Sequence, residues 1–309
     1  GKLRYGIIGS GGCGTNKHLA SYQALDDKVD LIAVCDINPE RADYVADMFD
    51  LEASYTDYRE MLANEKLDIV SVATPNHIHA PATIAALEAG CHVHCEKPAS
   101  LTADLVQQMV DAKNASGKKL MIGLNNRFSY WTEFAKKWIT AGNLGNIYHA
   151  KCGWKRVRGI PGKGGWFTTK EQSGGGPLID LGVHFLDVAN YLIDFPNPST
   201  VSGQTYSKFA DKQAFKPRAS GYTGTYDVED LAIGMVRYEN GCTMELEFSW
   251  ASNVAEQYTF VELYGDKGGL RFAKDELVLI QEFEGTMMKT YPELKNDGAW
   301  GEKEVEHFV

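Results

Sequence analysis

The stretch LRYGIIGSGGCG, residues 3–14, decides the fold. Its apolar run, residues 3–9, ends in glycines, and helix-like sequence follows. An apolar run bounded by glycine predicts a buried strand and a tight turn into a helix. Gly9, Gly11 and Gly14 meet the spacing G-x-G-x-x-G, which suits a turn whose backbone approaches a phosphate at a helix N-terminus. The predicted nucleotide contacts are Gly9, Gly11, Gly12, Cys13 and Gly14.

Glycine-rich turns also occur for structural reasons, so a second signal is needed. Asp36 supplies it, because it ends the next apolar run, VDLIAVCD (29–36), about 22 residues after the last glycine. A carboxylate at that place accepts hydrogen bonds from the ribose hydroxyls and repels a 2′-phosphate. Asp36 therefore predicts NAD, rather than NADP, as the cofactor. The alternative is that Asp36 only caps the end of the strand.

Through residue 125 apolar runs alternate with helix-like segments. Strands joined by helices of this length pair in parallel through right-handed crossovers. The first domain, residues 1–125, is therefore predicted to be an α/β Rossmann domain with a doubly wound parallel sheet. Further strands are expected at 67–74, 91–96 and 119–125, with helices at 38–49, 79–90 and 102–117.

From about residue 146 the pattern changes to alternating polar and apolar residues with hairpin turns. The second domain, residues 126–309, is predicted to be α+β, with one helix packed on a mostly antiparallel open sheet. The helix is expected at 178–194, and the strands at 146–159 and within 230–250, 258–272 and 277–283.

CHVHCEKPAS, residues 91–100, places two cysteines and two histidines close together. Alternate side chains of a strand face opposite ways, so these four ligands cannot converge on one tetrahedral ion. No metal site is therefore expected. What remains is Glu96-Lys97-Pro98 at the carboxyl end of the strand, the edge where ligands bind in open α/β sheets.

Composition excludes some classes of partner. The 309 residues carry a net charge of −10, which disfavours nucleic acid and anionic membranes, and no apolar run could span a bilayer. The six cysteines are too sparse for a disulfide framework, so a cytoplasmic, reducing location is expected. Gly1 stands where a Met is usual, which leaves open a leader that has been removed. A homo-oligomer, dimer or tetramer, is expected because the open sheet needs cover.

The ordered set of motifs resembles the family of glucose–fructose oxidoreductase, inositol dehydrogenase and MocA, which are NAD(P)-dependent sugar and cyclitol dehydrogenases. Besides the glycine turn, the motifs are ATPNHIH (73–79), EKP (96–98), NRF (126–128), GGGPLIDLGVHFLD (174–187) and VED (228–230). The resemblance covers essentially the whole chain. Members usually continue several dozen residues beyond the place where EKEVEHFV (302–309) ends, so a truncated C-terminal end is expected.

Asp180 and His184, at i and i+4, share one face of a predicted helix. A core histidine and a helix-terminal charge would explain them without chemistry. The resemblance instead implies catalysis by Lys97, Asp180 and His184. Oxidation of a secondary alcohol needs a base for the hydroxyl proton and a group that stabilises the alkoxide. We hypothesise that His184 is the base, Lys97 binds the reacting oxygen, and Asp180 orients an adjacent hydroxyl of the substrate.

The resemblance also implies cofactor contacts from Thr74, Pro75, Asn76, His79, Glu96, Lys97 and Arg127, the last of these near the nicotinamide or the substrate. The tryptophans and arginine of WKRVRGIPGKGGWF (154–167) suit a sugar, since aromatic faces pack on pyranose C–H groups. Substrate contacts are predicted for Trp154, Arg158 and Trp166. Two alternatives stay open: an NAD-binding sensor without turnover, and a sugar–sugar oxidoreductase or glycosidase that holds its NAD tightly.

Overall fold

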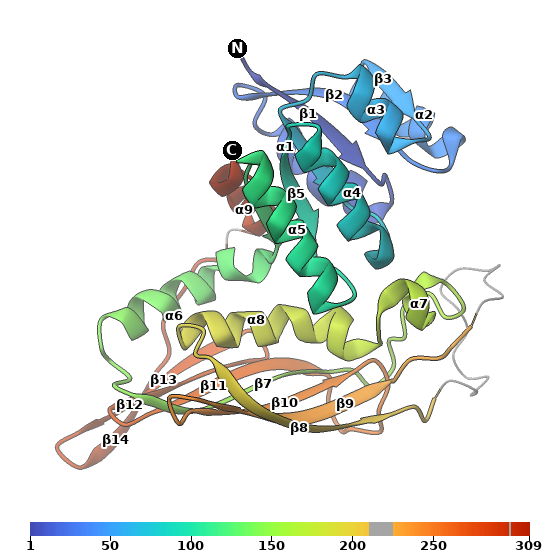
Figure 1. Ribbon diagram of the computed structural model, residues 1–309. Helices are drawn as coiled ribbons and strands as arrows, with labels where there is room; N and C mark the ends of the chain where they lie inside the picture. The colour runs from blue at the N-terminus through green and yellow to red at the C-terminus, as the bar shows by residue number, and fades with distance from the viewer. Residues whose placement is uncertain (210–224, 297) are drawn as a thin grey trace. The chain divides into compact units, whose positions relative to one another are not determined.

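The computed structural model describes residues 1–209, 225–296 and 298–309 (Figure 1). The chain forms two compact units, one of residues 1–124 with 299–309 and one of residues 125–298. The change of strand pattern near residue 146 lies within the second unit.

The first unit contains a six-stranded parallel sheet in the order β3-β2-β1-β4-β5-β6. This order confirms the predicted doubly wound sheet, whose order reverses between β1 and β4. The three-residue strand β3 was not predicted, because so short a run carries no periodicity. The strands are β1 (Leu3–Ile8), β2 (Val29–Cys35), β3 (Ala53–Tyr55), β4 (Ile69–Val72), β5 (His92–Glu96) and β6 (Leu120–Gly123).

Helices cover both faces of this sheet and bury two separate apolar cores. Cys91, Val93 and Cys95 pack in one core, which confirms that they share a face of their strand. Local signals set the helix ends: Asn38 and Thr102 cap α2 and α5, each by accepting a hydrogen bond from a backbone N–H three residues on. The helices are α1 (Ala20–Gln23), α2 (Pro39–Phe49), α3 (Tyr58–Asn64), α4 (Asn76–Glu88) and α5 (Ala103–Ser116), and the π-helical η1 (Gly14–Leu19) precedes α1.

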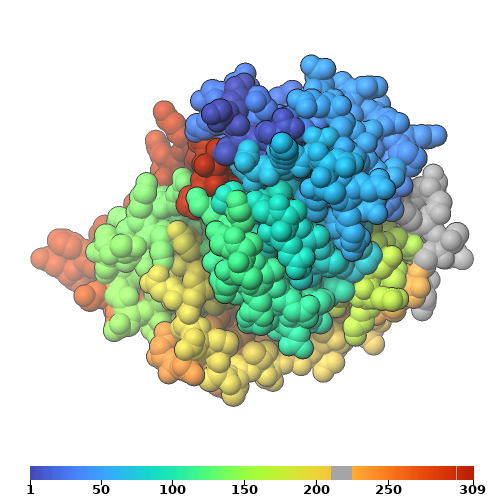
Figure 2. Space-filling model, turned by 45° about the horizontal axis from the view of Figure 1, so that its top comes forward, coloured from blue at the N-terminus to red at the C-terminus, as the bar shows by residue number. Residues whose placement is uncertain are grey.

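The last helix, α9 (Trp300–Phe308), also belongs to the first unit, although the sequence analysis placed it in the second domain. Val305 and Phe308 are buried in the core that contains Tyr5 and Tyr22. The red atoms of the C-terminal residues accordingly lie against blue N-terminal atoms in the space-filling view (Figure 2). Sequence order gave no hint of this return, because the burial partners lie at the opposite end of the chain.

The second unit contains an eight-stranded sheet in the order β14-β13-β12-β11-β7-β10-β9-β8, antiparallel except for the pair β7–β10. The predicted mostly antiparallel sheet is confirmed. The polar strand β8 was not predicted, because its exposed residues show no apolar alternation. The strands are β7 (Ile147–Lys155), β8 (Pro198–Tyr206), β9 (Leu231–Tyr238), β10 (Thr243–Ser249), β11 (Tyr258–Gly265), β12 (Gly268–Ala273), β13 (Glu276–Phe283) and β14 (Thr286–Thr290).

More than one helix accompanies this sheet, so the expectation of a single helix was wrong. The helical elements are η2 (Asn125–Phe128), α6 (Tyr130–Thr140), η3 (Trp166–Thr168), α7 (Lys170–Ser173), η4 (Leu178–Gly182) and α8 (Val183–Leu192). The predicted helix at 178–194 begins with the π-helical turn η4 and continues as α8. Leu181, Phe185 and Val188 of this helix are buried on the sheet, whereas Asp180 and His184 are only partly buried. The fold therefore presents the two polar side chains on one accessible face.

None of the helices in the described part of the chain is long and apolar enough to cross a membrane.

Candidate functional site

The predicted cofactor residues of the first unit gather at one edge of its sheet. Because β1, β2, β4 and β5 are parallel and in register, their carboxyl ends meet at the same edge. The glycine turn follows β1, Asp36 follows β2, Thr74 lies just beyond β4, and Lys97 follows β5. The edge is the one where open α/β sheets bind their ligands.

The glycine turn has the shape that a phosphate needs. Gly9 has a φ of +94°, and a Cβ there would lie 2.5 Å from the carbonyl oxygen of Ala73. A Cβ on Gly14 would lie 2.1 Å from the carbonyl oxygen of Gly9, so both positions require glycine. At Gly11, by contrast, an added Cβ would meet nothing within 4 Å. The fold therefore needs Gly9 and Gly14, whereas Gly11 borders open space, and its predicted contact with a pyrophosphate stays a prediction.

Asp36 anchors this turn. Its Oδ2 accepts hydrogen bonds from the backbone N–H and the hydroxyl of Ser10, at 3.0 and 2.9 Å, and its Oδ1 accepts one from the Asn38 N–H. Arg41 Nη1 lies 3.6 Å from Oδ2. A carboxylate has about four acceptor positions, so a ribose hydroxyl can still donate to it. Asp36 thus fits both its predicted ribose contact and a structural role in holding the turn.

The loop after β4 is tied to the loop after β5 through His79. Its Nδ1 lies 2.6 Å from the carbonyl oxygen of Pro98, and its Nε2 lies 2.9 Å from that of Thr74. His79 is buried, and burial lowers the pKa of its imidazole. Pro75 precedes the first residue of α4, Asn76, which is also buried. These residues shape the groove edge that the sequence analysis assigned to the cofactor.

Glu96 is buried at the end of β5, and its carboxylate is engaged by three groups. Oε1 lies 2.6 Å from Lys17 Nζ and 2.9 Å from His18 Nε2, and Oε2 accepts a hydrogen bond from the Lys97 N–H. Burial would raise the pKa of Glu96, but the His18 hydrogen bond and the Lys17 charge hold it well below its usual range. Glu96 therefore fixes the backbone of Lys97, and its predicted contact with the nicotinamide ribose stays a prediction.

Within the described residues, Cys13, His18 and Glu96 place ligand atoms within 4.8 Å of one another, close enough for a metal ion. Lys17 Nζ already lies 2.6 Å from the carboxylate of this group. A cation would compete with that ammonium for the same oxygen. We therefore assign no metal ion to Cys13, His18 and Glu96.

The second unit brings together three of the predicted site residues. Asp180 lies on η4 and His184 one turn later on α8, while Trp154 comes from β7. The ring centroids of Trp154 and His184 are 6.4 Å apart. Arg156, which the sequence analysis did not select, lies with its guanidinium carbon 4.6 Å from the Trp154 ring centroid. The arrangement offers a carboxylate, an imidazole and an aromatic face in one place.

Trp250 was also missed, and it contacts Asp180 directly. Its indole Nε1 donates a hydrogen bond to Asp180 Oδ2 at 2.9 Å, and its side chain is completely buried. Trp250 directly follows β10, whose polar and apolar residues alternate, and the sequence alone would assign a tryptophan in that place to the core. No local sequence pattern distinguishes a tryptophan that donates its indole N–H to a carboxylate from one that only fills the core.

Arg127, predicted to contact nicotinamide or substrate, is paired with Asp187 of α8. Its Nε and Nη2 donate to the two carboxylate oxygens of Asp187 at 2.7 and 2.5 Å. This pair raises the pKa of Arg127. The guanidinium carbon also lies about 5 Å from the ring centroids of Tyr191 and Phe195, at 5.3 and 5.0 Å. Two of its five N–H donors are therefore used on Asp187 within the second unit.

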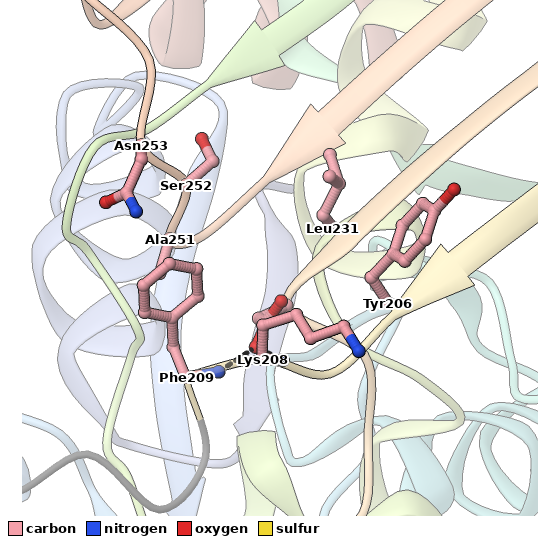
Figure 3. Close-up of a pocket in the computed structure, with 8 residues that line it drawn as sticks. Tyr206, Lys208, Phe209, Leu231, Ala251, Ser252 and Asn253 are labelled. Carbon is pink, nitrogen blue, oxygen red and sulfur yellow. Dashed lines mark hydrogen bonds between the residues drawn. The ribbon is translucent and has the colours of Figure 1, made fainter.

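Arg158 and Trp166 are the remaining predicted substrate residues, and each contacts neighbours of its own. The Arg158 guanidinium donates to Ser252 O and Asn253 Oδ1 and lies 4.8 Å from the Phe209 ring centroid. These three partners line a pocket of about 360 Å³ at the ends of β8, β9 and β10, with Tyr206 and Leu231 on its other side (Figure 3). Trp166 stacks on Phe167 at a centroid distance of 3.8 Å. Their substrate contacts stay predictions.

Two family models match the chain. One describes an oxidoreductase family with an NAD-binding Rossmann fold and matches residues 3–124. The other describes the GFO/IDH/MocA C-terminal domain and matches residues 132–271. Together they span both units of the structure.

Among curated relatives, D-glucoside 3-dehydrogenase of Escherichia coli is 38% identical over 268 residues, covering 86% of this chain and 76% of that protein. Levoglucosan dehydrogenase of Pseudarthrobacter phenanthrenivorans is 30% identical over 300 residues, covering 89% of this chain and 75% of that protein. Both matches extend over most of each chain.

Solved structures with a similar fold give matches of the same kind. Levoglucosan dehydrogenase in complex with NADH superposes with a TM-score of 0.86 at 26% identity, covering all of this chain and 89% of the other. Its complex with NADH and levoglucosan gives a TM-score of 0.81 at 28% identity, covering 98% and 83%. The glycine turn, the two-unit fold and these matches lead to one conclusion: the chain belongs to the Gfo/Idh/MocA family of oxidoreductases, and its first unit is the NAD-binding Rossmann domain of that family.

Proposed function

We propose that this protein is an NAD-dependent dehydrogenase that oxidises a secondary alcohol of a sugar, glycoside or cyclitol. In this proposal the first unit binds NAD and the second binds the substrate. The observation that carries it is that Asp180 and His184 lie four residues apart on one helical segment, both partly exposed, with the Trp154 ring 6.4 Å from that of His184. A carboxylate, an imidazole and an aromatic ring together suit a polyhydroxylated ring that must lose a proton.

NAD, when bound, would supply the hydride acceptor. The chain's own residues would handle the hydroxyl. Lys97 would donate a hydrogen bond to the reacting oxygen and stabilise the alkoxide, because an ammonium favours developing negative charge. His184 would take the hydroxyl proton, since an imidazole titrates near neutral pH. Asp180 would accept a hydrogen bond from a neighbouring hydroxyl and so orient the ring.

The backbone around Lys97 supports this proposed role. It follows β5 directly, its backbone N–H donates to the buried carboxylate of Glu96, and Pro98 comes next through a cis peptide bond. The hydrogen bond to Glu96 holds the backbone from which the lysine side chain starts, at the carboxyl edge of the sheet.

The names of the relatives narrow the substrate class. D-glucoside 3-dehydrogenase and levoglucosan dehydrogenase are both named for pyranose derivatives that carry a substituent at the anomeric carbon. The Trp154 ring suits the C–H face of such a pyranose. We therefore place glucopyranosides and anhydro sugars ahead of inositols and free aldoses as substrates.

A substrate panel tests this proposal. Absorbance of reduced nicotinamide would be followed with NAD and with NADP, against glucopyranosides, levoglucosan, aldoses, sugar acids and inositols. The proposal expects reduction of NAD by at least one pyranoside, with NADP a poorer acceptor because the Asp36 carboxylate, if it contacts the ribose as proposed, would repel a 2′-phosphate. No reduction with any member, while calorimetry shows NAD binding, would remove the dehydrogenase proposal.

A second candidate is an enzyme that keeps its nicotinamide bound and passes hydride between two sugars. An aldose–aldose oxidoreductase from Caulobacter crescentus, complexed with glycerol, superposes with a TM-score of 0.80 at 25% identity. Purified protein would be dialysed and then denatured, and the released nucleotide measured. Stoichiometric nucleotide after dialysis would favour this candidate, and empty protein that still turns over added NAD would favour the first.

A homo-oligomer remains part of the proposal. The sheet face away from the helices carries ion pairs, such as Lys151–Glu245 at 3.3 Å and Lys155–Glu247 at 3.9 Å, with Lys155 also 4.6 Å from the Tyr258 ring centroid. Such a mixed face suits a polar interface better than an apolar one. Solution mass by light scattering would decide, and a monomer at all concentrations would remove this part.

A further inference from the structure

The VED motif, residues 228–230, is not explained by the chemistry proposed above, yet it contacts the segment that carries Asp180. The Glu229 carboxylate accepts hydrogen bonds from the backbone N–H groups of Gly176 and Leu178, at 2.9 and 3.4 Å. These N–H groups lie at the start of η4, where a helix leaves its first donors unpaired. Glu229 therefore caps the helical segment of the candidate site from another part of the chain.

The close approach of these two segments also explains why residue 176 is a glycine. A Cβ on Gly176 would lie 2.0 Å from the carbonyl oxygen of Glu229, so only glycine lets the two backbones approach this closely. The Gly176 carbonyl oxygen in turn accepts the Asp180 N–H at 3.1 Å. The position of the Asp180 backbone thus follows from that of Glu229.

The next residue of the motif reaches Asp180 by a second route. The Asp230 carbonyl oxygen accepts the backbone N–H of Trp250 at 3.0 Å. Trp250 then donates its indole N–H to Asp180 Oδ2 at 2.9 Å from a fully buried position. A hydrogen bond from a buried indole N–H fixes the direction in which the carboxylate points.

We propose that Glu229 and Trp250 are positioning residues for Asp180. Glu229 fixes the backbone at the start of the helix, and Trp250 fixes the orientation of the carboxylate. The proposal rests on the proposed function in one respect, namely that Asp180 contacts the substrate. Neither residue touches substrate in this account, so both act through Asp180.

The first test needs no turnover. The six tryptophans give six indole N–H signals in a ¹⁵N-labelled sample of the whole chain, and Trp250→Phe identifies one of them by its loss. A hydrogen bond to a carboxylate moves an indole proton downfield. Asp180→Asn should therefore shift the Trp250 signal and leave that of Trp131, a buried tryptophan stacked on Phe272, unchanged. An unmoved Trp250 signal in Asp180→Asn would overturn the proposal.

The second test compares Trp250→Phe with Trp131→Phe, which removes the same atoms from the same core. Trp250→Phe should lower kcat/KM for the sugar about 10- to 100-fold, as expected for loss of a hydrogen bond to a charged group. The KM for NAD should not change. Trp131→Phe should not change kcat/KM beyond its effect on stability.

A double variant distinguishes the proposed role of Asp180 from the proposed positioning role of Trp250. In the Asp180→Asn background, Trp250→Phe should cost almost nothing further, because the contact is already altered. If Asp180→Asn itself turns over like the wild type, the proposed function of Asp180 fails, and this proposal with it. If Asp180→Asn is inactive but Trp250→Phe behaves like Trp131→Phe, the positioning role fails alone.

Glu229 has its own matched pair. Glu229→Gln keeps an oxygen that can accept the Gly176 N–H and should retain most of the kcat/KM, whereas Glu229→Ala should lose about tenfold or more. Equal activity of the two variants and the wild type would exclude the capping role. Circular dichroism and unfolding of each variant show whether it is folded before its kinetics are compared.

Discussion

The ammonium of Lys17 lies 2.6 Å from the carboxylate of Glu96, and both side chains are largely withdrawn from water, with 22% and 8% of their side-chain surfaces exposed. Lys17 also lies 3.1 Å from Glu304 Oε2 of α9, which is completely buried. One lysine therefore links the glycine turn, the strand that leads to Lys97, and the last helix of the chain.

Replacing this lysine should destabilise the first unit strongly. Lys17→Met leaves two carboxylates buried without their counter-charge, and breaking a buried pair in this way costs about 3–5 kcal/mol. Urea unfolding of the wild type and the variant measures this loss in the free energy of unfolding. Lys2→Met is the control, because the Lys2–Asp30 pair is 44% and 52% exposed, and its loss should cost at most about 1 kcal/mol. Equal effects of the two variants would contradict the assignment.

Stability should fall in mild acid through His18. Burial lowers the pKa of His18 to about 4, while the unfolded imidazole takes up its proton near its ordinary pKa of 6.5. Between these pH values the unfolded state binds more protons, so the free energy of unfolding falls as the pH falls, by up to about 1.4 kcal/mol per unit. Above pH 6.5 the effect is absent.

His18→Gln tests this by removing one titrating group. The other histidines remain in both proteins, so the difference between the two stability curves isolates His18. Chemical unfolding from pH 7 down to 4.5 should show the wild type losing stability more steeply than the variant. Parallel curves over that range would show that the native imidazole titrates as it does in the unfolded chain.

The glycine turn separates folding from cofactor binding. Gly14→Ala places a methyl group 2.1 Å from the Gly9 carbonyl oxygen and should cost about 1–3 kcal/mol of stability. Gly11→Ala meets no protein atom within 4 Å, so its unfolding should match that of the wild type within about 0.5 kcal/mol. Calorimetry should nevertheless find NAD binding weakened at least about tenfold, because the methyl group occupies the space left for the pyrophosphate. Unchanged NAD affinity in Gly11→Ala would place the phosphates elsewhere.

The Arg127–Asp187 pair should contribute to the second unit. Asp187→Asn removes the charge from a bidentate pair whose partners are 32% and 11% exposed, and the expected loss is about 1–3 kcal/mol. Asp194→Asn is the matched control: Asp194 also pairs with a cation, Lys136, but is 81% exposed and should change stability by less than about 0.5 kcal/mol. Comparable losses would mean that burial does not set the strength of these pairs.

Much of the first unit was predictable because its signals are local. The glycine turn, the acid at the end of β2 and the caps Asn38 and Thr102 each depend on residues a few positions apart. The helix α6 could also have been found, since Ser129 caps it and its buried residues Trp131, Thr132 and Ala135 follow a helical spacing.

The contacts that organise the candidate site could not have been found in this way. Lys17 and Glu96 are 79 residues apart, and Trp250 and Asp180 are 70 apart. Such pairs depend on the register of whole strands and on which face of each helix is buried. A sequence shows that a lysine or a tryptophan is present, but its partner is set only by the completed fold.

Lys97 and His184 are both proposed to act in the chemical step, and variants of these two residues provide the decisive experiment. NAD binding by calorimetry and turnover by nicotinamide absorbance would be measured for Lys97→Ala and His184→Ala, with the best substrate of the panel. The account predicts NAD affinity within about threefold of the wild type and turnover reduced by at least about 100-fold in both variants. Turnover near the wild-type value in either variant would contradict it.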